Sequence, residues 1–165
     1  MQKSARQIEE SKEHFLFPGN IFVSGESHWV TTILGSCVSV CLWDPARKIG
    51  GINHFLLPFW NGLGLASPKY GNIAIEKLIE KILRKGCNIE NLRAKIFGGA
   101  AILQSANNEK HIGLKNIALA KEYLESKKIP IVASDVGGIF GRRIKFNTST
   151  GVVLVKKIVK AKKRA

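Results

Sequence analysis

Two short stretches constrain the fold most, because both alternate apolar residues with small or polar ones. They are residues 34–43, LGSCVSVCLW, and residues 49–55, IGGINHF. An alternation with a period of two residues is typical of half-buried β-strands. The intervening Asp44-Pro45-Ala46-Arg47 is typical of a turn. The sequence therefore predicts a β-hairpin over this region.

The register of the hairpin decides which side chains meet. If Trp43 pairs with Lys48 across a four-residue loop, Cys37 lies directly opposite His54. Directly opposed residues have Cβ atoms about 4.5–5.5 Å apart, which is close enough for a thiol and an imidazole to share a proton. A slip of one residue would place the two side chains on opposite faces of the sheet.

The same register places Gly50, which offers no base, opposite Cys41. We therefore expect Cys41 to serve in packing. A buried cysteine is usually a small hydrophobic residue, and this reading stays open for Cys37 as well.

Three features nevertheless make Cys37 a candidate nucleophile. The turn at Gly35 and Ser36 leaves the backbone N–H groups of Ser36 and Cys37 clear of bulky side chains, as an oxyanion hole requires. His54 supplies the base that a thiol needs at neutral pH. Thr31, six residues before Cys37 on the preceding predicted strand, can orient the imidazole through its hydroxyl. The predicted site is a Cys/His/Thr triad.

Length and composition favour one cytoplasmic domain. A chain of 165 residues, 45% of them hydrophobic, can bury a core without disulfides or metals. The N-terminus lacks the apolar core of a signal peptide, and no run approaches the ~18 apolar residues of a membrane span. The three cysteines cannot all pair with one another and do not have zinc-site spacing, so we expect free thiols, no metal and no cofactor.

The charge is strongly basic. The formal net charge is +14, and residues 156–165 contain six basic residues and no acid. Such a tail either aids solubility or attracts an acidic macromolecule. A nucleic-acid-binding module is the alternative from another class, but the basic segments carry no recognisable reading motif and few aromatic residues.

The remaining pattern predicts a single-domain α/β fold, a mixed β-sheet sandwich with flanking helices. Further strands are expected over residues 14–17, 21–24, 29–34, 93–97, 129–133, 142–146 and 151–159. One amphipathic helix is expected to begin at Ser67-Pro68 and end at Gly86, and a second to follow residues 107–113 and end before Pro130. The expected organisation is a flexible N-terminal segment (1–13), one domain (14–159) and a basic tail (160–165).

Two glycine pairs, Gly98-Gly99 and Gly137-Gly138, each follow a predicted strand. Neither belongs to a G-x-G-x-x-G pattern or precedes Gly-Lys-Ser/Thr, so neither is typical of a phosphate-binding loop. We expect turns there, with an edge that faces a substrate or partner.

Several short motifs follow one another along the chain: Thr31 with Leu34-Gly35-Ser36-Cys37-Val38, Gly51 with His54, Tyr70-Gly71 with Ala74-Ile75, Lys95-Ile96-Phe97-Gly98-Gly99-Ala100, Ile112-Gly113 with Asn116, and Asp135 with Gly137-Gly138 and Gly141-Arg142. In this order they resemble the chemoreceptor glutamine deamidases of the CheD family, over about residues 18–155. The chain departs from the family pattern at Lys115, where arginine is common, and in its longer basic tail.

The resemblance implies that Cys37, His54 and Thr31 are the catalytic residues and that no cofactor takes part. It implies a fold akin to the catalytic domain of cytotoxic necrotizing factor toxins. The implied reaction converts glutamines on the cytoplasmic helices of chemotaxis receptors (methyl-accepting chemotaxis proteins) to glutamates through a cysteine thioester. Hydrolysis of the receptor methyl esters is an implied side activity.

The resemblance also implies a partner, a CheC-type phosphatase of the response regulator. An alternative role is therefore that of an adaptor for this phosphatase with weak catalysis, although the intact triad argues against it.

Overall fold

The computed structural model describes residues 11–101 and 107–159. Its strands are β1 (Lys12–Phe15), β2 (Ile21–Ser24), β3 (His28–Leu34), β4 (Val38–Asp44), β5 (Ile49–Asn53), β6 (Arg93–Gly98), β7 (Ile131–Val136), β8 (Gly141–Asn147) and β9 (Val153–Ile158). The helices are α2 (Gly71–Arg84) and α3 (Asn107–Ser126), and a short 3-10 helix, η1 (Ile89–Asn91), precedes β6.

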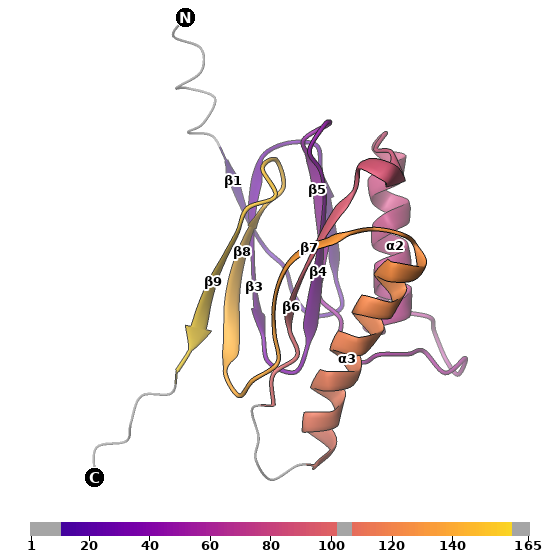
Figure 1. Cartoon of the computed structure of the whole chain (residues 1–165), viewed down its shortest axis with the longest axis vertical. Helices are drawn as coiled ribbons and strands as arrows, with labels where there is room; N and C mark the ends of the chain where they lie inside the picture. The colour runs from indigo at the N-terminus through magenta and orange to yellow at the C-terminus, as the bar shows by residue number, and fades with distance from the viewer. Residues whose placement is uncertain (1–10, 102–106, 160–165) are drawn as a thin grey trace, which may run out of the picture.

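The strands form two sheets that lie face to face. Sheet A has the order β1-β3-β8-β9, and sheet B has the order β2-β5-β4-β6-β7. Each sheet is mixed, because β1 runs parallel to β3 and β6 runs parallel to β7 while the other pairs are antiparallel. Figure 1 shows three layers, with sheet A on one side, sheet B in the middle and both helices on the far side of sheet B. The predicted α/β class with two mixed sheets is confirmed.

Alternation along the central strand β4 divides the apolar residues between two cores. Val38, Val40 and Leu42 pack under the helices, with side chains from α2 and α3. Cys41 packs between the two sheets, and the partly buried Cys37 contacts the same inter-sheet cluster. Because successive strand residues point to opposite faces, the odd-numbered residues of this stretch all face sheet A.

Helix α2 begins later than the sequence predicts. The expected start at Ser67-Pro68 is wrong, since the helix begins at Gly71 and Tyr70 is its N-cap. The backbone before it is occupied by a bridge between Leu57 and Tyr70, so these residues pair with a neighbouring segment instead of coiling. The predicted end is confirmed, because the helix stops immediately before Lys85 and Gly86 has a φ of 98°.

The hairpin of β4 and β5 is present, but its predicted register is wrong. Trp43 pairs with Gly50 and Asp44 pairs with Ile49, so the four-residue loop lies one residue later than expected. Asp44 ends the strand, and its Oδ1 accepts hydrogen bonds from the amides two and three residues further on. Lys48 takes up the reversal with a left-handed φ of 55°. Asp44 is therefore both the last residue of β4 and the residue whose side chain stabilises the loop.

The corrected register changes the partner of Cys41, which lies opposite Ile52 and not Gly50. Cys41 is 1% exposed, in agreement with a packing role.

At the chain ends, β1 starts at Lys12, two residues before the expected domain boundary. Residues 1–10 of the expected N-terminal segment and the expected tail over 160–165 lie outside the described residues. Of the helices described, none is both long and apolar enough to cross a membrane.

Candidate active site

His54 follows β5 directly and lies in the space between the two sheets. Its side chain is 2% exposed, and its Nδ1 lies 2.7 Å from Oγ1 of Thr32, on β3 of the other sheet. The same Thr32 hydroxyl donates to the backbone carbonyl of Leu16 at 2.8 Å. The imidazole is thus anchored to sheet A at one nitrogen.

These two contacts define the tautomer of His54. A threonine hydroxyl has one hydrogen, and the carbonyl of Leu16 can only accept, so the hydrogen points to Leu16. Thr32 therefore accepts from Nδ1–H, which leaves Nε2 of His54 with its lone pair. Nε2 is buried and has no hydrogen-bond partner among the described residues. A histidine held in this way is prepared to accept a proton at Nε2.

The hydroxyl that contacts His54 is that of Thr32, and this corrects the expectation for Thr31. The two neighbours on β3 point to opposite faces of sheet A. Thr31 lines a shallow depression with Glu13, Phe15 and Arg143 on the outer face. Spacing in the sequence identified the strand but could not decide between two adjacent threonines.

Cys37 lies on the same face of sheet B as His54, diagonally across the hairpin. The pairs Val38–Phe55 and Cys41–Ile52 share one register, which places Ser39 opposite His54. Cys37 is two residues before Ser39 and contacts the same inter-sheet cluster as Cys41. Diagonal neighbours of this kind are about 7–8 Å apart, within reach of long side chains. The predicted direct opposition is therefore wrong, whereas the shared face is as expected.

The loop before Cys37 is held by its carbonyl groups. The carbonyl of Gly35 accepts from the amide of Ala100 at 2.9 Å, and that of Cys37 accepts from the amide of Gly99 at 2.9 Å. The carbonyl of Ser36, between them, accepts from Nδ2 of Asn116 on α3 at 3.1 Å. Three successive carbonyls thus bond to the segment after β6 and to α3.

The backbone amides of Ser36 and Cys37 point away from the groups that bond these carbonyls. In a trans peptide the C=O and N–H groups point in opposite directions, so the N–H groups of Ser36 and Cys37 point away from Ala100 and Asn116. Neither amide has an acceptor among the hydrogen bonds of the described residues. Two such amides are the groups that the predicted oxyanion hole requires, and that role stays a prediction.

Asn116 also joins this loop to the histidine segment. Its Nδ2 donates a second hydrogen bond to the carbonyl of Leu56 at 3.0 Å, and the residue is fully buried. One amide group therefore spans the two segments that carry Cys37 and His54. The sequence motifs include Asn116 but do not predict its role. An asparagine in an otherwise apolar helix stripe is nevertheless a signal of a buried polar contact.

The two glycine pairs occupy different environments. Gly98 and Gly99 are buried beneath the Cys37 loop, and a Cβ at Gly98 would overlap the carbonyl oxygen of Cys37. They support the loop and present no surface to a substrate or partner, contrary to expectation. Gly137 and Gly138 form an open turn in which an added Cβ would meet nothing within 4 Å.

Burial keeps both reactive groups neutral. It lowers the pKa of His54 to about 4 and raises the pKa of the Cys37 thiol above its ordinary value. Burial also raises the pKa of Cys41. At neutral pH the site therefore holds a thiol and an uncharged imidazole and not a thiolate–imidazolium pair. Within residues 11–101 and 107–159, no cluster of three or more metal-ligating side chains occurs.

Fold and site together define a class: an α/β protein with a cysteine and a hydroxyl-anchored histidine between two mixed sheets. The model of the family described as "CheD chemotactic sensory transduction" matches residues 57–157. A protein of Trichlorobacter lovleyi named "Probable chemoreceptor glutamine deamidase CheD" is 53% identical over 87% of this chain and 89% of its own length. The chain belongs to the CheD family.

Two further relatives carry the same name. That of Sulfurimonas denitrificans is 45% identical over 92% of this chain and 97% of its own length. That of Rhodospirillum rubrum is 42% identical over 93% of this chain and 87% of its own length. The two alignments span 152 and 154 residues.

Solved structures give only a distant likeness. Bacillus licheniformis hypothetical protein YfiH matches with a TM-score of 0.43 and 18% identity, over 76% of this chain and 60% of that chain. Neisseria meningitidis protein NMB0706 matches with a TM-score of 0.45 and 11% identity, over 81% of this chain and 65% of that chain. At these scores neither match bears on the function.

The low pKa of His54 predicts a pH-dependent stability. The histidine has a pKa near 6.5 when unfolded and about 4 when folded, so between these values the unfolded chain binds more protons. The stabilisation is fully present above pH 6.5 and is lost as the pH falls toward 4. Between pH 7.5 and 5.0 we expect His54 to reduce the free energy of unfolding by about 2 kcal/mol.

Urea unfolding of the wild type and of His54→Gln at the two pH values measures this effect. The His54→Gln protein should lose about 2 kcal/mol less than the wild type on acidification. The exposed His111 provides the matched control, because His111→Gln should behave as the wild type does. Equal losses in wild type and His54→Gln would contradict the prediction.

Proposed function

We propose that this protein is a protein-glutamine deamidase that acts on chemoreceptors, with Cys37 as nucleophile and His54 as base. The observation that carries the proposal is the pair of hydrogen bonds at Thr32, which leaves Nε2 of a buried histidine unprotonated on the face that also holds Cys37. The names of the CheD relatives supply the substrate class, glutamine side chains on chemoreceptors.

The reaction begins from neutral partners. As the thiol of Cys37 attacks the carboxamide carbon of a glutamine, its proton passes to Nε2 of His54. Thr32 holds Nδ1–H and so stabilises the imidazolium that forms. The oxygen of the tetrahedral intermediate takes on negative charge and accepts hydrogen bonds from the amides of Ser36 and Cys37.

The intermediate then collapses to a thioester. The C–N bond breaks, His54 returns its proton to the nitrogen, and ammonia leaves. A water molecule, deprotonated at His54, attacks the thioester carbon, and the C–S bond breaks with return of the proton to sulfur. The product is glutamate on the substrate and free thiol on the enzyme.

Two implications of the CheD resemblance stay predictions. One is the likeness to the catalytic fold of cytotoxic necrotizing factor toxins. The other is pairing with a CheC-type phosphatase, which co-purification of the two proteins would test. A cytoplasmic location and a methylesterase side activity are likewise part of the proposal.

The central experiment measures deamidation directly. The protein is incubated with the cytoplasmic fragment of a chemoreceptor from the same organism, and tryptic peptides are analysed by mass spectrometry for a gain of about 1 Da at glutamine, the mass change of amide-to-acid conversion. Cys37→Ala should abolish the gain, whereas Cys41→Ala should retain it. A gain that persists in Cys37→Ala would remove Cys37 as the nucleophile.

The adjacent threonines form a matched pair of variants. Thr32→Val removes the hydroxyl that accepts from His54, and we expect the rate constant kcat to fall about 10- to 100-fold, as for one buried polar group left unpaired. Thr31→Val removes a hydroxyl on the outer face of the same strand and should change kcat less than about twofold. The reverse order of effects would restore Thr31 as the third member of the triad.

Asn116 acts as a positioning residue, since it holds the Ser36–Cys37 peptide group whose N–H faces the oxyanion. Asn116→Ala should lower kcat about 100-fold with little change in KM. The control is Asn147→Ala, because Asn147 is also buried but caps the turn between β8 and β9 through the amides of Ser149 and Thr150. Asn147→Ala should lower the melting temperature and leave kcat unchanged. An equal fall of kcat in both variants would reduce Asn116 to a purely structural role.

A further inference from the structure

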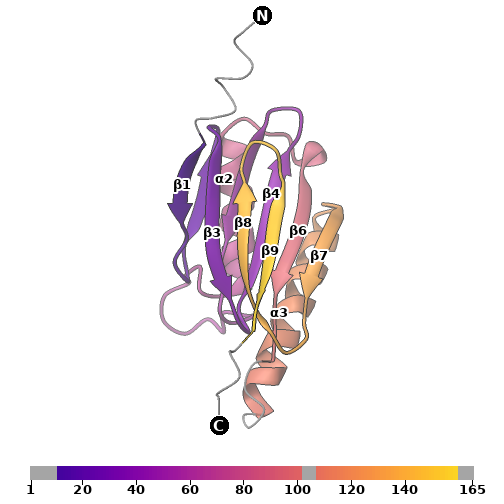
Figure 2. The same ribbon diagram turned by 90° about the vertical axis from the view of Figure 1, so that its left-hand side faces the viewer.

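The outer face of sheet A is an uncovered surface. Helices α2 and α3 pack against sheet B, and Figure 2 shows sheet A directed toward the viewer with no described element in front of it. Ile33, Arg143 and Lys156 lie side by side on this face, because Ile33 pairs with Arg143 and Arg143 pairs with Lys156. A sheet face that mixes apolar and basic side chains and lacks a cover is a candidate interaction surface.

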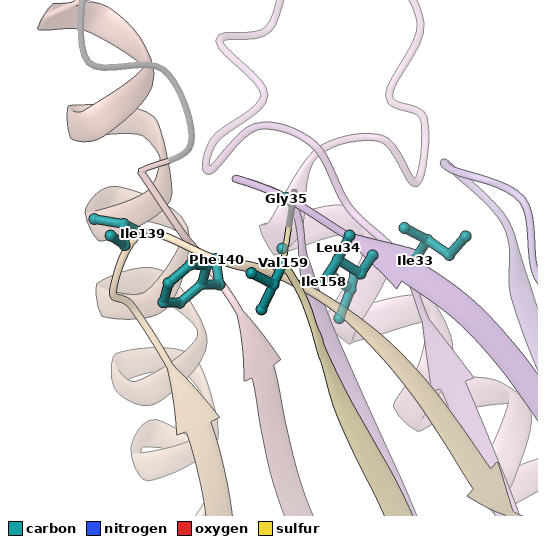
Figure 3. Close-up of a pocket in the computed structure, with 8 residues that line it drawn as sticks. Ile33, Leu34, Gly35, Ile139, Phe140, Ile158 and Val159 are labelled. Carbon is teal, nitrogen blue, oxygen red and sulfur yellow. The ribbon is translucent and has the colours of Figure 1, made fainter. Parts of the chain in front are cut away.

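At one end of this face lies an apolar groove of about 340 Å³. We call it the β3–β9 groove, and its lining residues are Ile33, Leu34, Gly35, Ile139, Phe140, Gly141, Ile158 and Val159. Figure 3 shows the lining residues, which come from the end of β3, the segment that leads into β8, and the end of β9 with Val159 after it. Five of them, Ile33, Ile139, Phe140, Ile158 and Val159, are between 38% and 68% exposed.

The β3–β9 groove continues directly into the loop of the candidate nucleophile. Gly35 lines the groove and is followed by Ser36 and Cys37. Its carbonyl is bonded to the amide of Ala100, so the wall of the groove and the loop are parts of one rigid support. The open turn at Gly137 and Gly138 leads into Ile139 and Phe140 on the opposite wall. A polypeptide seated in the groove therefore contacts Gly35, two residues before Cys37 in the chain.

The rim of the β3–β9 groove is positively charged. Residues 136–159 contain five basic residues and no acidic one. Two of the five are paired, Arg142 with Asp135 at 3.2 Å and Lys145 with Glu13 at 3.1 Å. Arg143, Lys156 and Lys157 make no ion pair with any acid that the structure describes. The groove is thus matched to an occupant with apolar residues and acidic flanks.

A second copy of the chain does not fit this description. The net charge is +14, so two copies that met at the groove would bring like charges together. We propose that the β3–β9 groove holds an amphipathic segment of the protein substrate, apolar toward the groove and acidic at its edges, and so brings a neighbouring glutamine to Cys37. This inference rests on the proposed function and specifies how that site takes its substrate.

The test measures binding separately from turnover. A fluorescent cytoplasmic fragment of a chemoreceptor from the same organism is titrated with the Cys37→Ala protein, which retains the groove. In this background the double variant Phe140→Ser with Ile158→Ser should raise Kd about tenfold or more, as expected for two apolar contacts. The second double variant, Ile139→Ser with Val159→Ser, alters the more exposed side chains and should raise Kd in the same direction.

The matched control is the pair Val132→Ser with Leu114→Ser, two side chains that are 52% and 54% exposed but lie outside the groove. This control should bind the fragment with the same Kd as the Cys37→Ala protein. Arg143→Gln with Lys156→Gln should weaken binding and reduce its dependence on salt. With Cys37 present, the groove variants should raise KM for the fragment and leave kcat unchanged.

Three outcomes overturn the inference, and a fourth overturns only the proposed function. Unchanged Kd in both groove variants, or no binding by the parent protein, removes the groove as a docking site. If binding is lost only in the charge variant, Arg143→Gln with Lys156→Gln, the binding is non-specific electrostatic attraction. A dimer in sedimentation that becomes a monomer in the groove variants, with receptor binding intact, assigns the groove to a second copy. If binding follows the groove as predicted but no glutamine is deamidated, the proposed function fails and the docking site stands.

Discussion

The hydrogen bond between Thr32 and His54 joins the two sheets at the point where the candidate chemistry lies. Thr32 belongs to sheet A, and His54 follows a strand of sheet B, so the 2.7 Å contact exists only because the sheets pack face to face. The carbonyl of Leu16 takes the one hydrogen of Thr32, and this choice leaves the lone pair of His54 on Nε2. The packing of the two sheets therefore fixes the tautomer of His54 and leaves Nε2 as its basic nitrogen.

The other half of the site depends on α3 and on the turn after β6. The amides of Gly99 and Ala100 and the side chain of Asn116 take up three successive carbonyls, and the N–H groups of the same loop are left free. Ser36 and Cys37 are half-buried, and within residues 11–101 and 107–159 no acceptor is bonded to their amides, so these two N–H groups are available to a bound group. The pair is most simply understood as a preformed site for a developing negative charge.

The proposed catalytic and docking roles fall on different faces of the same sheet. The inner face of sheet A presents Thr32 to His54, whereas its outer face presents Ile33 and the basic side chain of Arg143. Gly35 connects the two regions, because it lines the β3–β9 groove and begins the loop that carries Cys37. Part of the basic surplus, Arg143 and Lys156, lies on this outer face beside Ile33.

Sequence patterns predicted the approximate positions of the strands and of both helices, and the placement of Cys37 and His54 on one face of a hairpin, because period-2 and helical patterns reflect which side of an element is buried. They could not determine the hairpin register, because Asp44 suits a loop and a strand end equally well. Nor could they choose between Thr31 and Thr32, or show that Asn116 reaches two loops. These depend on contacts between distant segments, which only the packing of the sheets and of α3 decides, since no local preference encodes the position of a partner far along the chain.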